Sequence, residues 1–488
     1  METGPSGASS GRPGDSRQPP SIDPGAPAIP PLPATGLIRF LPGVWVLRHY
    51  RRAWVWRDVF AGLVLTSLLV PAGMGYAEAA GLPAISGLYA TIVPLVAYAL
   101  VGPSRILVLG PDSALAALIL ATVAPLAGGD PARALALGSA TALFAGGLCV
   151  VAGISRFGFL TDLLSKPVRV GYMNGIAVSV IVSQAPKLCG FSASGEGVLQ
   201  GLFAFGRGIL DGRSKLPAVA IGGASLVAIL VLKKVAPKWP GVLFAVVLGT
   251  LAVALLGLSG SLPVVGPVPR GIPLPALPVL RLSDLGPLLA GSAGIALVAF
   301  ADMSVLSRTF AAHTGQRIDP NRELVGLGIA NLAAGFFQGF PVTSSSSRTP
   351  VAQAAGARTQ LTGIVGAAAI VVLLVAAPDL VKNLPVAALA AVVIAAAVGL
   401  VDIPSMRLFA RVRASDFFVS VFCFLAVATF GVILGIALSV GLSLLDFIRR
   451  AWRPHDAVMG RAPGVKGYHD ITRYPAARQV PGLLLNRW

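Results

Sequence analysis

The stretch that decides the fold is GPSRILVLGPDS, which runs from Gly102 to Ser113 and interrupts an apolar segment where a membrane helix would otherwise continue. A second interruption, GFPVTSSSSRTP, runs from Gly339 to Pro350 in the other half of the chain. Each combines proline with a short run that looks extended and with small or hydroxyl residues that begin a new helix. A matched pair of Gly/Pro-interrupted apolar segments indicates the binding site of a secondary transporter built from repeats.

The composition of the chain is that of a membrane protein. Hydrophobic residues make up 55% of the sequence and charged residues only 12%, about half the charge of a soluble domain. The mean hydropathy is +0.80. Uncharged runs reach the length of about 20 residues that a membrane-spanning helix needs: Val59–Ala77, Ala79–Ser104, Thr359–Pro378 and Phe417–Leu445. We therefore expect an all-α integral membrane protein with the lipid bilayer as its surroundings.

The formal net charge of +18 would suit a protein that binds nucleic acid, but the distribution of that charge argues against such a partner. Lys and Arg gather at the ends of apolar segments: Arg48, Arg51, Arg52, Arg57, Lys233, Lys234, Arg449, Arg450 and Arg453. This positive-inside pattern predicts a multi-pass protein of the plasma membrane with both termini in the cytoplasm. Termini on the same side require an even number of spans.

The apolar segments predict seven helices in each half of the chain. The first transmembrane repeat, residues 45–258, contains Val59–Gly81, Ile85–Val101, a half-helix Asp112–Leu126, Ala132–Ile154, Leu160–Gln184, Leu216–Val235 and Gly241–Leu258. The second repeat, residues 286–453, contains Gly286–His313, Glu323–Gln338, a half-helix from Ser347, Leu361–Val381, Val386–Val401, Phe417–Thr429 and Val432–Arg449. Residues 259–285, rich in Pro and Gly, form the linker, and Gly201–Leu210 is an amphipathic segment.

An odd number of spans in each half requires the second repeat to be inverted relative to the first. Inverted repeats bring their two half-helices together near the bilayer midplane. The N-terminus of a half-helix presents unpaired N–H groups and the positive end of the helix dipole. Two such ends that face each other favour an anion. The sequence therefore predicts fourteen segments with an anion site between the two halves.

Side chains at the start of the second half-helix would add to this site. Arg348 supplies a permanent positive charge, and several hydroxyl groups can donate hydrogen bonds: Thr343, Ser344, Ser345, Ser346 and Ser347. The alternative is that the serines only cap the helix and that Arg348 pairs with a carboxylate.

Asp112 opens the first half-helix. At such a position an Asp is more often an N-cap than a ligand, and its charge would repel an anion. The alternatives are a protonatable group or an ion pair with Arg348. Asp112 and the adjacent Ser113 are kept among the candidate substrate-binding residues.

Longer motifs surround both interruptions. In the first half PAGMGYA, from Pro71 to Ala77, is followed by AGLP, GLY, GPSR and GPD. In the second half EL, GIAN, FFQGFP, SSSR and AGARTQL follow one another from Glu323 to Leu361. These motifs resemble those of the SulP (sulfate permease) family of anion transporters, and the resemblance covers about residues 45–488.

The resemblance implies a core domain of segments 1–4 and 8–11, a gate domain of segments 5–7 and 12–14, and an elevator-like cycle of alternating access. By position, Tyr76 matches an aromatic residue of the family's anion pocket. Ser345, Ser347 and Arg348 match the site at the second half-helix. Ala72 stands where many members have Gln, so one hydrogen bond to the substrate is expected to be missing.

Asp302 matches an acidic position of the family, usually Glu, that is associated with the coupling cation or proton. A carboxylate deep in an apolar helix costs about 2.5–3.5 kcal/mol on insertion scales and is functional by default. We expect Asp302 to bind H⁺ or Na⁺ when the anion binds nearby. The structural alternative is an ion pair with Arg308 or Arg348.

The two ends of the chain are predicted to lie outside the membrane. Residues 1–44 are assigned to a disordered cytoplasmic arm, because residues 1–36 are rich in Gly, Pro and Ser and lack hydrophobic periodicity. Family members usually continue into a cytoplasmic STAS domain, and Pro481–Trp488 resembles its first strand. We expect residues 454–488 to be the truncated start of a STAS-like region, loosely docked because a lone strand has no sheet to join.

Together these features predict a secondary active transporter of inorganic anions of the sulfate type, coupled to H⁺ or Na⁺, that can assemble as a homodimer. Bicarbonate or dicarboxylate transport by the same fold is the alternative, as is a nucleobase/cation symporter with carboxylates at its site. A passive anion channel would have a similar sequence. An enzyme is disfavoured, since the four His residues form no HExxH motif and no GxSxG is present. No metal or cofactor is expected beyond the coupling ion.

Overall fold

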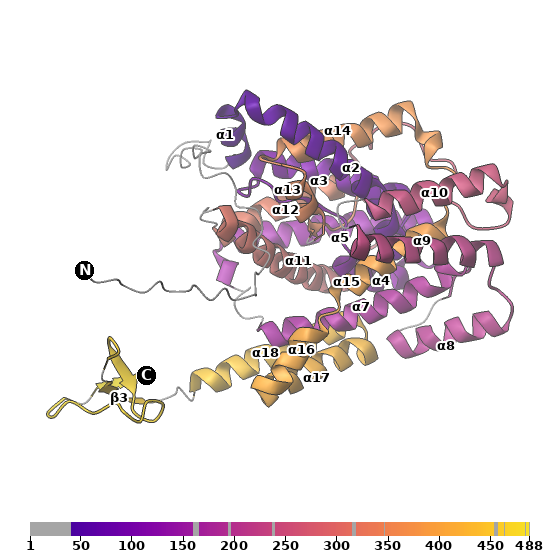
Figure 1. Ribbon diagram of the computed structural model, residues 1–488. Coiled ribbons are helices and arrows are strands. Elements are labelled where there is room, and N and C mark those ends of the chain that lie inside the picture. Colours follow the sequence, from indigo (N-terminus) through magenta and orange to yellow (C-terminus); the bar gives the residue numbers. More distant parts are fainter. Residues whose placement is uncertain are drawn as a thin grey trace, which may run out of the picture.

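The computed structural model describes residues 41–159, 165–193, 197–236, 240–314, 319–345, 347–452, 457–462, 464–483 and 485–487. The described chain is mostly helical as far as Trp452, and a small strand-containing segment follows (Figure 1). Of the predicted N-terminal arm, residues 1–40 lie outside the described residues. A short helix, α1 (Pro42–Arg48), begins within the last residues assigned to that arm.

A helix stands at each segment predicted for the first repeat. Their bounds are α2 (Arg52–Ala79), α3 (Ala84–Val101), α4 (Ser113–Ala127), α5 (Pro131–Ile154), α7 (Lys166–Leu188), α9 (Leu216–Val235) and α10 (Gly241–Leu255). The amphipathic segment is α8 (Gly197–Leu210), and a 3₁₀ turn, η2 (Phe157–Phe159), follows α5. The start predicted for the fifth segment at Leu160 lies outside the described residues. The described helix begins at Lys166 with a proline in its first turn, where proline is well tolerated.

The second repeat also has a helix at each predicted segment. Their bounds are α11 (Leu285–Thr314), α12 (Pro320–Phe336), α13 (Arg348–Ala354), α14 (Leu361–Ala376), α15 (Val386–Leu400), α17 (Ala414–Phe430) and α18 (Val432–Trp452). One further helix, α16 (Ile403–Val412), was not predicted because its basic residues remove it from the uncharged runs. The linker contains the 3₁₀ turns η3 (Leu258–Gly260) and η4 (Leu282–Asp284), and η5 (Pro378–Leu380) follows α14.

The two interruptions meet as a short antiparallel pair of strands in the interior of the molecule. β1 (Leu109–Gly110) pairs with β2 (Thr343–Ser344), with Leu109 opposite Ser344 and Gly110 opposite Thr343. All four residues are buried. Irregular backbone at membrane depth is tolerated only where its polar groups find partners within the protein. The pairing provides such partners and fixes the two interruptions to each other.

The helices form two groups that correspond to the core and the gate. In the first group α12 packs on α5 and α3, α14 packs on α2 and α3, and α11 packs on α4 and α5. In the second group α7 packs on α15 and α17, and α9 packs on α10 and α15. Small residues allow the two halves to interlock in the core. A Cβ placed on Gly146 of α5 or on Gly328 of α12 would come within 2.7 Å of the other residue's carbonyl oxygen.

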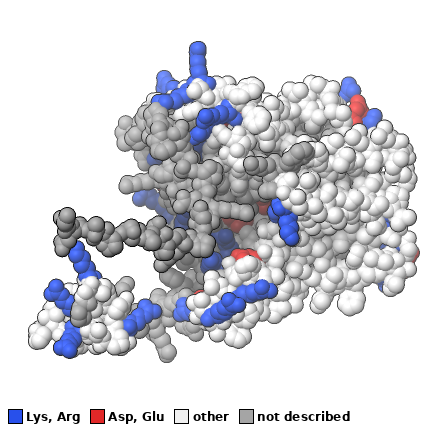
Figure 2. Space-filling model, viewed as in Figure 1, with Lys and Arg blue, Asp and Glu red and all other residues white. Residues whose placement is uncertain are grey.

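Six of the described helices are long and apolar enough to cross a membrane, judged by length and composition: α2, α3, α5 and α9 in the first half, the segment Leu282–Phe310 at α11, and the segment Val386–Val412 at α15. Figure 2 shows a broad uncharged surface, with Lys and Arg gathered mainly toward the end of the molecule that carries α1 and the C-terminal strands. This arrangement is that of a multi-pass membrane protein.

The linker between the halves runs along the second half rather than away from it. The N–H of Val265 donates to the carbonyl of Leu384 at 3.0 Å, and the N–H of Ala276 donates to the carbonyl of Phe336 at 2.8 Å. The buried Asp284 at the end of the linker pairs with Arg133 of α5 at 3.1 Å. The linker therefore ties the start of α11 to the first half.

The expectation that the C-terminal strand has no sheet to join is wrong. β3 (Ala457–Arg461) pairs antiparallel with both β4 (Tyr468–Asp470) and β5 (Leu485–Arg487), which gives a three-stranded sheet in the order β4-β3-β5. β3 and β4 are joined by a short Gly-rich connection, and neither segment is a continuous apolar run. The sequence pattern therefore gave no signal for them as strands.

Candidate functional site

The first interruption ends at the N-terminus of α4, which Asp112 caps. The backbone of Asp112 is extended, and its Oδ1 accepts a hydrogen bond from the N–H of Ala114 at 3.1 Å. This is the N-cap interaction predicted for Asp112. The adjacent Ser113 is buried, and its hydroxyl oxygen lies 3.5 Å from the same carboxylate. The N–H groups of Leu115 and Ala116 donate to the carbonyl oxygen of Asp112 at 3.2 and 3.1 Å, so this terminus offers an anion mainly the positive end of the helix dipole.

Arg348, the first residue of α13, lies against this helix terminus. Its side chain is 2% exposed, and Nη2 donates to the carbonyl oxygen of Pro111 and lies 3.8 Å from Oδ2 of Asp112. Nε and Nη1 are buried and have no hydrogen-bond partner among the described residues. Buried polar groups without partners cost free energy, most of all when charged. The two free guanidinium nitrogens are therefore suited to an anion.

Gly110 makes room for this guanidinium group. A Cβ at Gly110 would lie 2.9 Å from Nη1 of Arg348, and the φ of Gly110 is +157°. A side chain at this strand position would both strain the backbone and displace the guanidinium. The approach of Arg348 to the backbone of β1 thus depends on a glycine.

The predicted hydroxyl groups have different surroundings. Ser345 is buried, and its hydroxyl oxygen lies 3.1 Å from that of Ser347, which is itself exposed. The hydroxyl of Ser344 is buried and has no partner among the described residues. The hydroxyl of Thr343 donates to the carbonyl of Ala299 in α11 at 2.7 Å, so Thr343 holds β2 in place.

Tyr76 of α2 joins the same cluster. It is buried and interacts electrostatically with Asp112 and Arg348. Ala72, one turn earlier in α2, is also buried. Ser346 lies outside the described residues. The structure thus brings together Tyr76, Asp112, Ser113, Ser345 and Arg348, with Ser347 at the exposed edge.

Asp302 lies in the middle of α11 and is partly buried. It interacts electrostatically with Asp112 of the site and with Arg169 of α7. Arg348, one of the predicted alternative partners, pairs with Asp112 instead. Tyr172 of α7, which the sequence did not single out, is fully buried beside Asp302, and its hydroxyl has no partner in the described chain. Asp302 therefore lies within electrostatic range of both the anion site and α7 of the gate.

Side chains of the second half hold the first interruption. Nε2 of Gln360, the residue before α14, donates to the carbonyl oxygens of Ser104 and Leu107 at 2.8 and 2.9 Å. The hydroxyl of Thr349 in α13 accepts from the N–H of Val108 at 3.1 Å. Gln360 and Thr349 thus provide hydrogen-bond partners for backbone groups of the first interruption. The spacing of these residues in the sequence does not predict this role.

The second interruption is held mainly by its own half. The side chain of Asn331 in α12 accepts from the N–H of Val342 at 2.8 Å and donates to its carbonyl at 3.1 Å. The hydroxyl of Ser139 in α5 donates to the carbonyl of Gly339 at 3.1 Å, which is the contribution of the first half.

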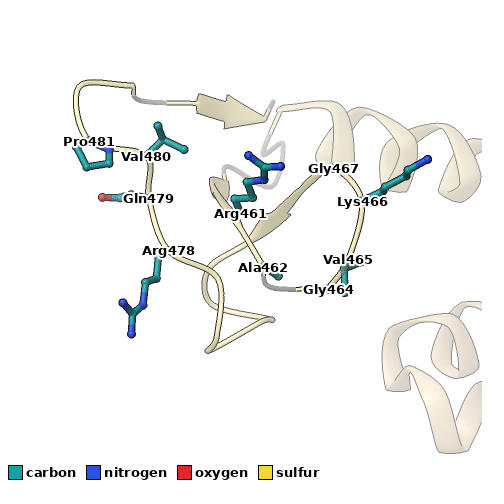
Figure 3. A pocket seen from close by; sticks show the side chains of 10 residues that line it. All are labelled: Arg461, Ala462, Gly464, Val465, Lys466, Gly467, Arg478, Gln479, Val480 and Pro481. Carbon is teal, nitrogen blue, oxygen red and sulfur yellow. The ribbon is translucent and has the colours of Figure 1, made fainter.

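A separate cavity of about 660 Å³ lies in the C-terminal sheet (Figure 3). Three of its lining residues are basic, namely Arg461, Lys466 and Arg478. In Figure 3 the side chains of Lys466 and Arg478 point away from each other and outward. Their charges do not converge on one point, so this cavity is a weaker anion site than the buried cluster around Arg348. Among the described residues no group of three or more His, Cys, Asp or Glu could hold a metal ion.

The two interrupted segments pair beside a buried arginine, inside a helical membrane domain with core and gate groups. This arrangement defines a membrane transport protein with a site suited to anions. The comparison with protein families agrees. Residues 55–423 match the sequence model of the Sulfate permease family. The chain belongs to this family and is an anion transporter of the sulfate permease type.

The relatives are named as sulfate transporters and solute carriers. The chain is 41% identical over 461 residues to "Probable sulfate transporter MT1781" of Mycobacterium tuberculosis (strain CDC 1551 / Oshkosh), with 94% of this chain and 81% of that protein covered. It is 31% identical to human "Solute carrier family 26 member 6", with 92% of this chain and 62% of the human protein covered.

Solved structures show the same fold. The structure titled "The overall structure of SLC26A9" superposes with a TM-score of 0.81 at 20% identity and covers 92% of this chain and 74% of its own. The transmembrane domain of the cyanobacterial bicarbonate transporter BicA superposes with a TM-score of 0.69 at 24% identity, covering 81% of this chain and 98% of its own.

Proposed function

We propose that the protein is a secondary active transporter that carries sulfate or a similar inorganic anion across the plasma membrane. The observation that carries this proposal is Arg348, a buried guanidinium with two unpaired nitrogens beside the capped N-terminus of α4. A tetrahedral oxyanion offers acceptors to both nitrogens at once, and the positive dipole end of a helix N-terminus favours the same ligand. Tyr76, Ser113, Ser345 and Ser347 would complete the wall of the site.

The coupling ion would bind at Asp302. Uptake of an anion against an inside-negative potential requires a compensating cation. Asp302 lies near the anion site without an ion-pair partner in the described chain, so it can take up H⁺ or Na⁺ when the anion binds. Because Asp302 interacts electrostatically with Arg169 of α7, loading of Asp302 would alter the attraction between core and gate. The transport step would be an elevator movement of the core relative to the gate.

Bicarbonate or a dicarboxylate is the second candidate substrate. One solved structure of this fold is titled a bicarbonate transporter, and Ala72 cannot donate the hydrogen bond that a Gln at its position would supply. A site with fewer directional donors would discriminate less between oxyanions.

The proposal also includes the topology and the assembly of the protein. The positive charges at the ends of the apolar segments support a cytoplasmic location of both termini. The transporter would assemble as a homodimer.

Flux into proteoliposomes tests the function. Purified protein would be reconstituted and uptake of radiolabelled sulfate, bicarbonate and chloride measured with and without H⁺ and Na⁺ gradients. We expect accumulation of sulfate above equilibrium with one of the two gradients. Asp302→Asn should abolish gradient-driven accumulation while sulfate binding stays within about twofold of the parent. Asp319→Asn, which alters an exposed acidic residue at the start of α12, is the matched control. Uphill uptake by Asp302→Asn with the ion dependence of the parent would exclude Asp302 as the coupling residue.

A further inference from the structure

A second buried polar cluster holds the start of the first interruption. Glu323, in the first turn of α12, is fully buried. The hydroxyl of Tyr98 in α3 donates to its Oε2 at 2.6 Å, and the hydroxyl of Ser104 in the first interruption donates to its Oε1. Within the described chain no Lys or Arg lies at ion-pair distance from this carboxylate. Among the described residues, the side-chain partners of the buried Glu323 carboxylate are therefore hydroxyl groups alone.

Capping of α12 does not explain this group. An acidic residue in the first turn of a helix often serves the helix terminus, but Asp319 already caps α12 by accepting from the N–H of Asn321 at 2.9 Å. The carboxylate of Glu323 is directed across to α3 and to the interruption instead. Only a carboxylate presents two acceptor oxygens to these two donors, since a Gln would present one. Burial of the Glu323 carboxylate without a cation is costly. Its hydrogen bonds with Tyr98 and Ser104 therefore indicate a specific role.

The tie leads along a short path to the anion site. Ser104, which Glu323 holds by its side chain, is also held by its carbonyl, through Gln360. The chain then runs through Val108, whose carbonyl accepts from the N–H of Ser345 at 3.0 Å, into β1. The next residue after β1 is Pro111, whose carbonyl accepts from Arg348. Ser104, which Glu323 holds, and Pro111, which Arg348 contacts, are thus seven positions apart in the chain.

We propose that Glu323 is a positioning residue for the anion site. By holding Ser104 it fixes the register of the first interruption against β2, and this register sets where Pro111 and the N-terminus of α4 stand relative to Arg348. Glu323 does not touch the anion. The inference rests on the proposed function, because it concerns the same site.

A double-mutant cycle on anion affinity tests this role. The dissociation constant for radiolabelled sulfate would be measured with purified protein for the parent, Glu323→Gln, Ser104→Ala and the double variant. We expect each single variant to raise the dissociation constant roughly tenfold, as for the loss of a hydrogen bond to a charged group. The double variant should be no weaker than the single variants, because both changes break the same tie. The Michaelis constant for uptake should rise while the maximal rate changes little.

Asp284→Asn is the matched control, because it breaks a buried carboxylate contact, with Arg133, away from the site. It should lower thermal stability and leave the sulfate dissociation constant unchanged. If Glu323→Gln cannot be purified, Tyr98→Phe and Ser104→Ala each remove one hydroxyl donor and retain the carboxylate, and Ser104→Ala should weaken binding more. Affinities equal to the parent in Ser104→Ala, or weakening that multiplies in the double variant, would overturn the proposal.

Arg348→Ala separates this proposal from the proposed function. If Arg348→Ala binds sulfate as tightly as the parent, the anion site itself is misplaced. If Arg348→Ala weakens binding and Ser104→Ala does not, the site stands and only the positioning role of Glu323 fails.

Discussion

The two interruptions meet as one strand pair, but they contribute different things. The first leads into α4, a helix of 15 residues with a side-chain cap from Asp112. The second leads into α13, a helix of 7 residues whose N-cap, Ser347, makes no capping hydrogen bond. The first therefore supplies a well-formed helix terminus and backbone groups, whereas the second supplies side chains, above all Arg348. The symmetry that the sequence suggests is one of topology and not of chemistry.

Their supports differ as well. Glu323, Thr349 and Gln360, all from the second half, hold the first interruption. The second is held mainly by Asn331 and Ala299 of its own half. The position of the α4 terminus thus depends on how the two halves pack. The second interruption is placed mainly by its own half, although the side chain of Arg348 contacts Pro111 and Asp112 of the first. Substitutions in the second half should reach the anion site through the first interruption.

The largest effect on sulfate binding is expected from removing the side chain of Arg348, which the second interruption supplies. Arg348→Ala leaves the α4 terminus in place, so sulfate binding should weaken by about 1–3 kcal/mol without being lost. Isothermal titration of purified protein would measure this change. Arg133→Ala, which removes a half-buried arginine outside the site, is the control and should bind sulfate as the parent does.

A smaller loss should follow from displacing the same group from the side of the first interruption. In Gly110→Ala the new Cβ would stand 2.9 Å from Nη1 of Arg348, and the guanidinium must move. We expect sulfate affinity to fall by about 1 kcal/mol, comparable to one weakened hydrogen bond. Gly128→Ala, at the other end of α4, also has a positive φ but meets no atom within 4 Å. It should cost stability and leave affinity unchanged, and a loss of affinity there would show that backbone strain alone explains Gly110→Ala.

The cap of α4 separates stability from binding. Asp112→Ala removes the hydrogen bond to Ala114 and should lower the free energy of unfolding by about 1 kcal/mol. Asp112→Asn keeps an N-cap and removes the negative charge 3.8 Å from Arg348, so sulfate should bind a few times more tightly. Thermal unfolding and titration on both variants would check this. Weaker binding by Asp112→Asn would mean that the carboxyl group of Asp112 contributes to anion binding, for example by taking up a proton or a cation together with the anion.

The smallest effects concern the hydroxyls of the second interruption. Ser345 is buried against β1 and its side chain accepts from the N–H of Arg348 at 3.4 Å, whereas Ser347 is exposed. Ser345→Ala should weaken sulfate binding by about 0.5 kcal/mol, the low end for one hydrogen bond, and Ser347→Ala by less. The reverse order in a titration series would place the anion at the edge of the site rather than against the strand pair.

The sequence could predict the segments because they depend on local composition. The apolar helix α9 has the predicted bounds, Leu216 to Val235, and the interruptions are marked by Gly and Pro. The N-cap role of Asp112 could be predicted for the same reason. The C-terminal sheet was not predicted, because its strands are only three to five residues long and have no periodic signal.

The supports of the site could not be predicted, because they join distant positions. Glu323 contacts Tyr98 and Ser104 across more than 200 residues of sequence. A Glu near the start of a helix is equally consistent with a solvated first turn. Only the packing of α12 on α3 decides that its carboxylate is buried, and one sequence carries no signal for that packing.

The central claim is that the two interruptions together form one anion site. A structure of the purified protein with selenate, an analogue of sulfate whose selenium scatters anomalously, tests it most directly. The account predicts one strong peak between the N-terminus of α4 and the guanidinium of Arg348, near Gly110 and Ser345, and a peak of clearly lower occupancy there in Arg348→Ala at the same selenate concentration. A peak elsewhere in the membrane domain, or one that persists at the same position and occupancy in Arg348→Ala, would contradict it.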